Sequence, residues 1–225
     1  MLPPVAIVWP CPLSVDAYAA LGKTLEVPRP DCPSCARAMT FWSGYVRPVR
    51  VLGRVVRLFV RRARCGPCGT THALLPAFVL RKRVDVVEVV GEAITAVVEG
   101  RCGVRPVAAA LGVPHATARG WIRRFVARAG ELTLAFAALG LELGGTSAGS
   151  APAPKRALIA LSEAFRAAST LPGWALLGRW RFCSAVSGGS LIAANTTSPY
   201  LVIGKRRFMP PVPFPADDKE PKGGT

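Results

Sequence analysis

Four of the seven cysteines stand in two pairs, and each pair has the spacing of a metal-binding turn. The pairs are Cys32-Pro-Ser-Cys35 and Cys65-Gly-Pro-Cys68. Pro and Gly favour tight turns, and two such pairs supply four thiolates, the complete ligand set of a structural zinc site. A redox dithiol is the alternative, but two pairs and no βαβ pattern around either one favour metal. We therefore predict one structural Zn²⁺ per chain, bound by Cys32, Cys35, Cys65 and Cys68. His72 is a substitute ligand only if a cysteine is not used, so a hydrogen-bonded or surface role is expected for it.

A second group of residues suited to binding lies between His115 and Arg124. His115, Arg119 and Arg123 recur every four residues, so on a helix they share one face. Arginine can bind guanine edges and phosphates, and Thr or His can reach either. An amphipathic helix with a solvated basic face would show the same pattern. We favour DNA because of the surrounding sequence. The predicted DNA contacts from this helix are His115, Thr117, Arg119, Arg123 and Arg124.

The basic helix is expected to be the second of two short helices joined at Gly112. Pro106 is placed at the first position of the first helix, and Pro114 opens the second. Gly112 suits the left-handed backbone that often follows a helix. The predicted buried residues are Val107, Ala108 and Leu111 in the first helix and Ala118, Trp121, Ile122 and Phe125 in the second. This arrangement predicts a helix-turn-helix unit, whose second helix enters the major groove of DNA.

A third helix is expected immediately before this pair. Asp85 is placed as its cap, with Glu88 three residues later, and Gly100 ends it. Its predicted buried face consists of Val84, Val87, Gly91, Ile94 and Val98.

The two cysteine pairs bracket a predicted β-hairpin. Residues 40–52 and 54–64 are rich in Val and aromatic residues, and Gly53 lies between them. In the second strand Val56, Leu58 and Val60 alternate with basic or aromatic residues, which predicts one buried and one exposed face. Residues 73–83 are expected to form an extended link. The basic residues of the hairpin and link, predicted to contact phosphates, are Arg57, Arg61, Arg62, Arg64, Arg81, Lys82 and Arg83.

Composition supports a polyanionic partner. The 225 residues carry 29 Lys and Arg against 13 Asp and Glu, for a formal charge of +16. Residues 1–130 hold 19 of the basic and 7 of the acidic side chains, and no acid lies between Asp31 and Asp85. A local basic excess of this kind favours nucleic acid over an anionic membrane.

We expect a cytoplasmic, nucleoid-associated protein without membrane contact. Residues 1–9 lack the charged start of a secretory signal, and prolines interrupt the apolar run. The longest uncharged run, 182–204, is too polar for a transmembrane helix.

The predicted fold class is α+β: a small β-hairpin zinc ribbon, an all-α three-helix helix-turn-helix unit, and a C-terminal region that is partly helical and partly disordered. The expected divisions are 1–76, 77–130, 131–208 and a disordered tail, 209–225. Helices are expected at 131–143 and 155–169, with a linker between them.

Several motifs resemble an uncharacterised family of bacterial zinc-ribbon and helix-turn-helix proteins linked to mobile elements. They are Cys32-Pro-Ser-Cys35, Phe-Trp-Ser-Gly-Tyr at 41–45, Arg64-Cys65, Thr-His-Ala-Leu-Leu-Pro at 71–76, and Val-Arg-Pro-Val at 104–107. The arrangement also resembles the N-terminal DNA-binding half of insertion-sequence transposases. The resemblance covers about residues 1–130 and implies sequence-specific binding to double-stranded DNA.

We do not expect an enzyme. Phosphoryl transfer by transposases needs clustered carboxylates to hold metal ions. After residue 130 the chain offers only Glu131, Glu142, Glu163 and three acids near the C-terminus. The expected function is that of a regulator or accessory factor of a mobile element. The alternatives are the DNA-binding half of a split or degenerate transposase, whose catalytic chain is encoded separately, and a zinc-stabilised module that binds RNA or protein. A homodimer is left open.

Overall fold

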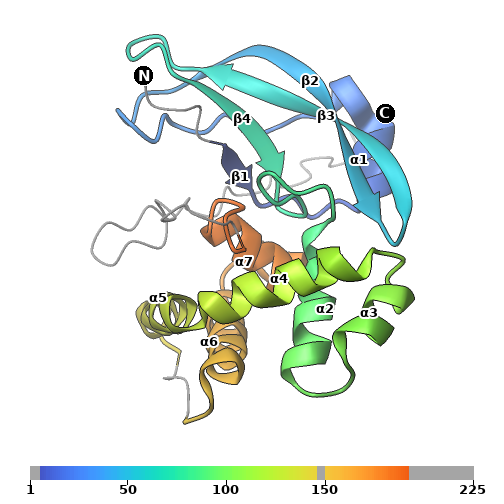
Figure 1. The fold of residues 1–225 in the computed structure, drawn as a ribbon. Coiled ribbons are helices and arrows are strands. Elements are labelled where there is room, and N and C mark those ends of the chain that lie inside the picture. The colour runs from blue at the N-terminus through green and yellow to red at the C-terminus, as the bar shows by residue number, and fades with distance from the viewer. Residues whose placement is uncertain (1–5, 146–149, 193–225) are drawn as a thin grey trace, which may run out of the picture.

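The computed structural model describes residues 6–145 and 150–192, which form an α+β fold. A four-stranded sheet lies on one side of a group of helices, as Figure 1 shows. The strands are β1 (Ile7–Trp9), β2 (Thr40–Val51), β3 (Arg54–Arg64) and β4 (Thr71–Pro76), in the spatial order β1-β4-β3-β2. The prediction of an α+β chain is confirmed.

The predicted hairpin is β2 and β3, which pair antiparallel from Thr40 opposite Arg64 to Val51 opposite Arg54. Leu52 and Gly53 both have positive φ, 46° and 80°. Two such residues make the tight turn whose twist matches that of the flanking strands. Val56, Leu58 and Val60 of β3 are buried, as their alternation predicted.

Residues 73–83 differ from the extended link that was expected. Residues 73–76 belong to β4, which pairs antiparallel with β3 and parallel with β1. Residues 77–80 follow the strand and are buried, with Phe78 and Leu80 both fully so. This apolar run becomes core because the chain turns from the sheet toward the helices here. After the strand, the chain returns to the surface at 81–83, where Lys82 is exposed.

Three helices follow: α2 (Val87–Val98), α3 (Val104–Ala110) and α4 (His115–Ala127), which contact one another. Gly112, between α3 and α4, has φ of 64°, as predicted. Pro106 lies two residues inside α3 rather than at its first position, which Val104 takes. The helix can begin earlier because a proline in the first turn removes no intrahelical hydrogen bond.

The predicted burial of these helices is largely confirmed. Of the predicted residues of α3 and α4, Ile122 alone is half-buried and the others are buried. In the α2 region, Val98 is half-buried and Val84 is 50% exposed, so the prediction for Val84 is wrong. Val84 lies before the helix, where its main chain rather than its side chain is engaged: its carbonyl accepts from Arg50 N.

Asp85 does not cap α2, contrary to the prediction. The capping position is Val86, and no side chain caps the helix. The Asp85 carboxylate instead accepts two hydrogen bonds from the Arg50 guanidinium of β2, at 2.6 and 3.0 Å. Val86 N also donates to the Arg50 carbonyl. Side-chain and main-chain hydrogen bonds of Arg50 therefore hold the start of α2 against the end of β2.

We expect Asp85→Ala to destabilise the protein by about 3–5 kcal/mol, because it removes one partner of a largely buried ion pair. Asp85 is 3% exposed and Arg50 25%. Urea denaturation would measure the change. The matched control is Asp16→Ala, which breaks the exposed Arg54–Asp16 pair and should cost no more than about 1 kcal/mol. Equal losses of unfolding free energy in the two variants would contradict a stabilising role for the Arg50–Asp85 pair.

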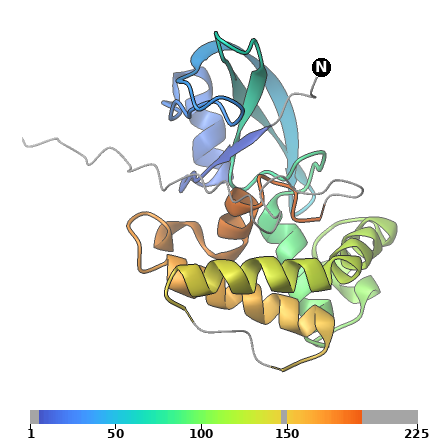
Figure 2. The same ribbon diagram turned by 90° about the vertical axis from the view of Figure 1, so that its left-hand side faces the viewer.

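Helices at the two ends of the described chain complete the core. They are α1 (Val15–Leu21), followed by a 3₁₀ turn (Gly22–Thr24), and then α5 (Ala129–Glu142), α6 (Ala153–Ala168), a 3₁₀ turn (Ala175–Leu177) and α7 (Arg179–Val186). In Figure 2, α5 and α6 lie along each other beneath the sheet. The helical prediction for 131–143 and 155–169 is confirmed, with slightly different ends.

The α7 helix joins the sheet side to the helical side. Its Trp180 ring lies directly over Gly91 of α2, where an added Cβ would be 2.2 Å from the ring. Its Arg181 pairs with Glu88 of α2 and donates to the Leu13 carbonyl near the N-terminus. The buried side chains of sheet and helices form one continuous cluster. The predicted disordered tail, residues 193–208 of the predicted C-terminal region, and part of the linker before α6 lie outside the described residues.

Candidate functional site

The two cysteine pairs form two matching turns. In the first, Ala36 N donates to the Cys32 carbonyl at 2.8 Å, and in the second Gly69 N donates to the Cys65 carbonyl at 2.9 Å. Ala36 and Gly69, each four residues after the first cysteine, have φ of 53° and 68°. Each turn therefore curls its two thiols toward the same point.

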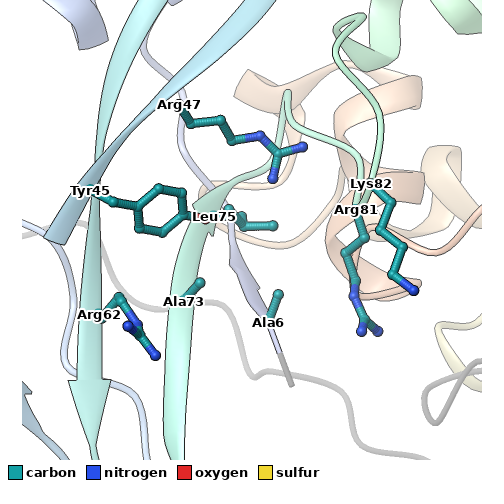
Figure 3. Close-up of a pocket in the computed structure, with 8 residues that line it drawn as sticks. All are labelled: Ala6, Tyr45, Arg47, Arg62, Ala73, Leu75, Arg81 and Lys82. Carbon is teal, nitrogen blue, oxygen red and sulfur yellow. The ribbon is translucent and has the colours of Figure 1, made fainter. Parts of the chain in front are cut away.

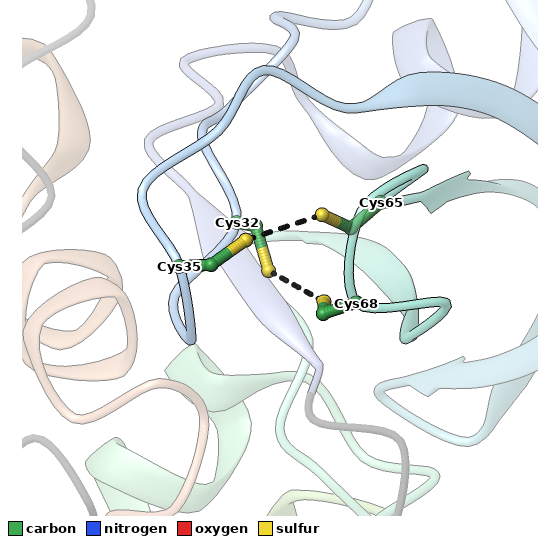
Figure 4. Close-up of side chains that lie close together, drawn as sticks. All are labelled: Cys32, Cys35, Cys65 and Cys68. Carbon is green, nitrogen blue, oxygen red and sulfur yellow. Dashed lines mark hydrogen bonds between the residues drawn. The ribbon is translucent and has the colours of Figure 1, made fainter.

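The turns face each other, so that all four thiols meet (Figure 4). The Sγ atoms of Cys32 and Cys68 are 3.5 Å apart and those of Cys35 and Cys65 are 3.3 Å apart. All four lie within 4.8 Å of one another, and none forms a disulfide. Sulfurs bound tetrahedrally at 2.3 Å from one ion would be separated by about 3.8 Å. The four cysteines could therefore bind one metal ion with little rearrangement.

Two residues outside the thiol set, Thr70 and His72, lie next to it. The Thr70 hydroxyl lies 3.3 Å from Cys68 Sγ, and hydrogen bonds from Thr70 are the largest cause that lowers the pKa of Cys68, to about 6. A thiolate, rather than a thiol, is the form that binds metal. His72 is buried, with Nε2 3.9 Å from Cys32 Sγ. It is therefore a buried neighbour of the cluster rather than a surface residue. From this position it could orient the Cys32 thiol as a metal ligand.

The outer side of α4 carries the residues predicted to read DNA. His115, Arg119 and Arg123 are exposed, on the side of the helix away from the buried Ala118 and Trp121.

Thr117 and Arg124 are half-buried. Arg124 folds back along the helix over Gly120, where an added Cβ would lie 2.9 Å from Arg124 Nη1. The structure thus places three of the five predicted residues fully at the surface.

Seven of the ten acids among the described residues pair with arginines outside the exposed face of α4. Within residues 6–145 and 150–192, neither Arg119 nor Arg123 has an ion pair. The pairs that do form are Arg50–Asp85, Arg54–Asp16, Arg101–Glu92, Arg101–Glu99, Arg128–Glu131, Arg166–Glu163 and Arg181–Glu88. The positive charge of this face is therefore not neutralised by neighbouring acids in the described part of the chain.

The basic residues predicted to contact phosphates fall into different environments. Arg57 and Arg64 are exposed, and Arg64 lies over the ring of Trp42 at 5.1 Å. Arg61 is half-buried, donates to the Lys23 carbonyl and stacks on Phe41. The internal contacts of Arg61 leave it fewer donors for a ligand than Arg57 has.

The other predicted phosphate contacts gather where the sheet meets the helices. Arg62, Arg81 and Lys82 line one pocket. Arg83 follows them and approaches α4: burial first, and then the like charge of Arg124, lower its pKa. The structure therefore brings this loop of basic residues next to α4, although Arg83 and Arg124 are 41 positions apart in the sequence.

The hairpin tip also touches the α3–α4 turn. A Cβ added to Gly112 would lie 3.6 Å from Gly53 Cα. The residues at the tip and turn therefore place the β2–β3 hairpin against the helix pair.

Sequence reasoning did not single out Tyr45 and Arg47 of β2, which line the same pocket as Arg62. Their spacing of two residues puts them on one face of the strand. In the structure Tyr45 pairs with Val60 of β3. Had this register been predicted, it would have placed Tyr45 and Arg47 on the same face of the sheet as the buried Val60.

Comparison with a family model gives a match that covers the cysteine cluster, α2, α3 and the first part of α4. Residues 32–121 match a domain of unknown function (DUF6431). The matched segment begins at Cys32, the first cysteine of the cluster, and ends at the buried Trp121 of α4. No curated protein and no solved structure matches the chain. No helix of the described residues has both the length and the apolar character needed to cross a membrane.

Proposed function

We propose that this chain is a zinc-containing protein that binds double-stranded DNA sequence-specifically, with α3 and α4 as a helix-turn-helix. The observation that carries the proposal is the exposed face of α4, where His115, Arg119 and Arg123 recur at four-residue steps without an acidic partner in the described residues. A helix with this face can enter the major groove and place arginines at base edges.

The geometry of the three helices supports this assignment. The turn at Gly112 is short, and the buried Ala118, Trp121 and Phe125 hold α4 against α2 and α3. Helix-turn-helix units use the first helices as a support and leave the outer face of the last one free. The hairpin tip at Gly53 would brace the turn from the sheet side.

We propose that the four cysteines hold zinc as a structural ion. The cluster offers four sulfur ligands and so leaves no open coordination position, as in structural rather than catalytic zinc sites. Four thiolates also suit iron. Zinc is favoured because paired Cys-x-x-Cys turns on either side of a hairpin are the arrangement of zinc ribbons.

We propose that the protein binds DNA without catalysing a reaction and acts as a regulator or accessory factor of a mobile element. The link to a mobile element is based on the resemblance of the motifs. A separately encoded transposase is then the expected partner of this chain. Neighbouring reading frames that encode a catalytic chain would instead favour the DNA-binding half of a split transposase.

The test begins with selection of bound sequences from a random duplex pool, followed by titrations of the selected and random duplexes. Arg119→Ala should relax the preference at one base position, at a cost of about 1–3 kcal/mol for the selected duplex. Arg62→Ala should weaken binding to all duplexes alike. It should also reduce the slope of log K against log salt concentration by about one.

The two variants serve as each other's control, because each removes one arginine charge. Circular dichroism should first show that both are folded. If the two changed the selected and random duplexes by the same factors, α4 would not be reading sequence. A selection that returned no preferred sequence would overturn specific binding.

A module that binds RNA is the second candidate, and one observation favours it. Trp42 of β2 is 61% exposed, with the Arg64 guanidinium 5.1 Å above its ring. Exposed aromatic rings beside arginine are the surfaces on which unpaired bases stack. Tighter binding to single-stranded RNA than to any duplex, lost in Trp42→Ala and kept in Arg119→Ala, would support this alternative.

A further inference from the structure

A basic pocket crosses the sheet next to the loop that leads to the helices (Figure 3). Its volume is ≈ 290 Å³, near the lower end of the range of about 300–1,000 Å³ for small-molecule sites. Side chains reach into it from the strands on one side and from the loop on the other. The lining residues are Ala6, Tyr45, Arg47, Arg62, Ala73, Leu75, Arg81 and Lys82.

The pocket combines four cations with an apolar floor. Arg47, Arg62, Arg81 and Lys82 surround it, and no acid lines it among the residues that the structure describes. Cations held close together repel one another, so an anion bound between them would be stabilised by all four. The arginine guanidinium can donate two parallel hydrogen bonds to a carboxylate or a phosphate. A phosphate monoester carries about −1.5 to −2 charges at pH 7, so it suits a group of four cations better than a single carboxylate does.

Two of the cations are held in place by the protein itself. Arg47 Nη2 donates to the carbonyls of Leu80 and Arg83, at 2.8 and 2.7 Å. Arg81 N donates to the Gly189 carbonyl at 2.8 Å, and its guanidinium lies 3.4 Å from Ser190 Oγ. These contacts use some of the arginine donors and orient the rest, so less side-chain freedom is lost when an anion binds.

The loop side of the pocket is also held in an unusual conformation. Lys82 has φ of 55°, in the left-handed region that a lysine seldom occupies. Residues held in this way occur preferentially at ligand-binding positions. Here the conformation keeps Lys82 at the rim of the pocket, beside Arg81 (Figure 3).

The floor adds a flat aromatic surface. Tyr45 is 39% exposed as a residue, and its ring points across the pocket toward Leu75 (Figure 3). Ala6 and Ala73 complete the apolar part. A ligand that satisfies both halves of the site has a phosphate for the cations and a planar ring for the tyrosine. The small volume suits one nucleotide better than two.

We propose that this pocket binds the 5′-phosphate and base of a single nucleotide, either free or at the end of a nucleic-acid strand. The phosphate would lie among Arg47, Arg62, Arg81 and Lys82, and the base would stack on Tyr45. The site uses no residue of α4, but it shares Arg62, Arg81 and Lys82 with the phosphate contacts expected for the duplex. Its test is distinguishable from the duplex titrations because it measures mononucleotide binding with no duplex present.

In the first experiment, isothermal titration calorimetry measures binding to the full-length, zinc-loaded protein. The three ligands, titrated separately, are 2′-deoxyadenosine 5′-monophosphate, 2′-deoxyadenosine and inorganic phosphate. The monophosphate should bind at least tenfold more tightly than inorganic phosphate, and the nucleoside should bind more weakly than the monophosphate. Absence of monophosphate binding at millimolar concentration would overturn the proposal. So would equal binding of the nucleoside.

Variants locate the binding. Arg62→Gln and Tyr45→Ala should each weaken monophosphate binding at least fivefold. The control is Lys155→Gln, which removes one exposed charge from α6, outside the pocket, and should leave binding within twofold. Equal weakening by Arg62→Gln and Lys155→Gln would show general charge attraction and overturn the site. Arg62→Lys, which keeps the charge, should recover part of the affinity if Arg62→Gln is folded but weak.

A competition experiment identifies the source of the nucleotide. In this experiment, tetranucleotides that carry either a 5′-phosphate or a 5′-hydroxyl compete with a fluorescent deoxyadenosine monophosphate for the protein. Displacement by the phosphorylated strand alone supports a strand end as the ligand. Displacement by neither strand supports a free nucleotide. Equal displacement by both strands would contradict recognition of a terminal phosphate and overturn the proposal.

Discussion

Loss of the proposed zinc ion should unfold residues 32–72 and should do so more completely than any single substitution of a core residue. In small zinc-binding peptides the metal contributes on the order of 10 kcal/mol to folding, whereas a whole domain is stable by only about 5–15 kcal/mol. The Cys35→Ser, Cys68→Ser double variant should therefore contain no zinc. Metal analysis, together with amide exchange across residues 32–72, would measure both effects.

The matched control is Cys102→Ser, because Cys102 is half-buried and lies outside the cluster. It should keep one zinc per chain and the stability of the parent protein. Acidification should release the metal, since protons compete with it for the thiolates, and affinity should rise again as the pH is raised. Zinc retained by the double variant, or iron in place of zinc in the parent, would contradict our assignment.

Trp121→Ala should destabilise the protein by about 3–5 kcal/mol, since it removes a large buried aromatic side chain. Trp121 is 2% exposed and lies on the inner side of α4, between Ala118 and Phe125. The midpoint of thermal unfolding should fall by on the order of 10 °C. Duplex binding should be lost together with the folded structure, and a thermal melt followed by circular dichroism would measure the shift.

Val126→Ala is the matched control on the same helix. Val126 is 46% exposed, so its truncation should change stability by no more than about 0.5 kcal/mol. Duplex binding by this variant should be unaltered. If Trp121→Ala melted at the same temperature as Val126→Ala, α4 would not be anchored by its tryptophan. The arrangement proposed for reading DNA would then lose its support.

Local patterns in the sequence were sufficient to predict the hairpin and most of the helices. The alternation of Val56, Leu58 and Val60 has the period of a strand, and the buried stripe of α4 has the period of a helix. The turn at Gly53 and the left-handed Gly112 are determined by residues beside them in the chain, because glycine adopts positive φ without steric cost. The four cysteines were also predicted together, because paired thiols in tight turns have few other uses.

Other features could not be read from neighbouring residues. Asp85 has the sequence context of a helix cap, yet its carboxylate binds Arg50, which is 35 residues earlier and offers two charged hydrogen bonds in place of one backbone N–H. Residues 77–80 resemble a linker in isolation, and they are core because the sheet and helices both pack on them.

The sequence by itself thus determined which segments form most of the strands, helices and paired cysteine turns, since short-range periodicity and turn chemistry decide these. Tertiary structure alone decided how the basic residues group. Arg61, Arg62 and Arg64 are near neighbours in one strand, but the first is held by Lys23 and Phe41, the second lines a pocket and the third covers Trp42. Alternation along a strand separates adjacent side chains, and pairing with distant strands and loops then gives each one different partners.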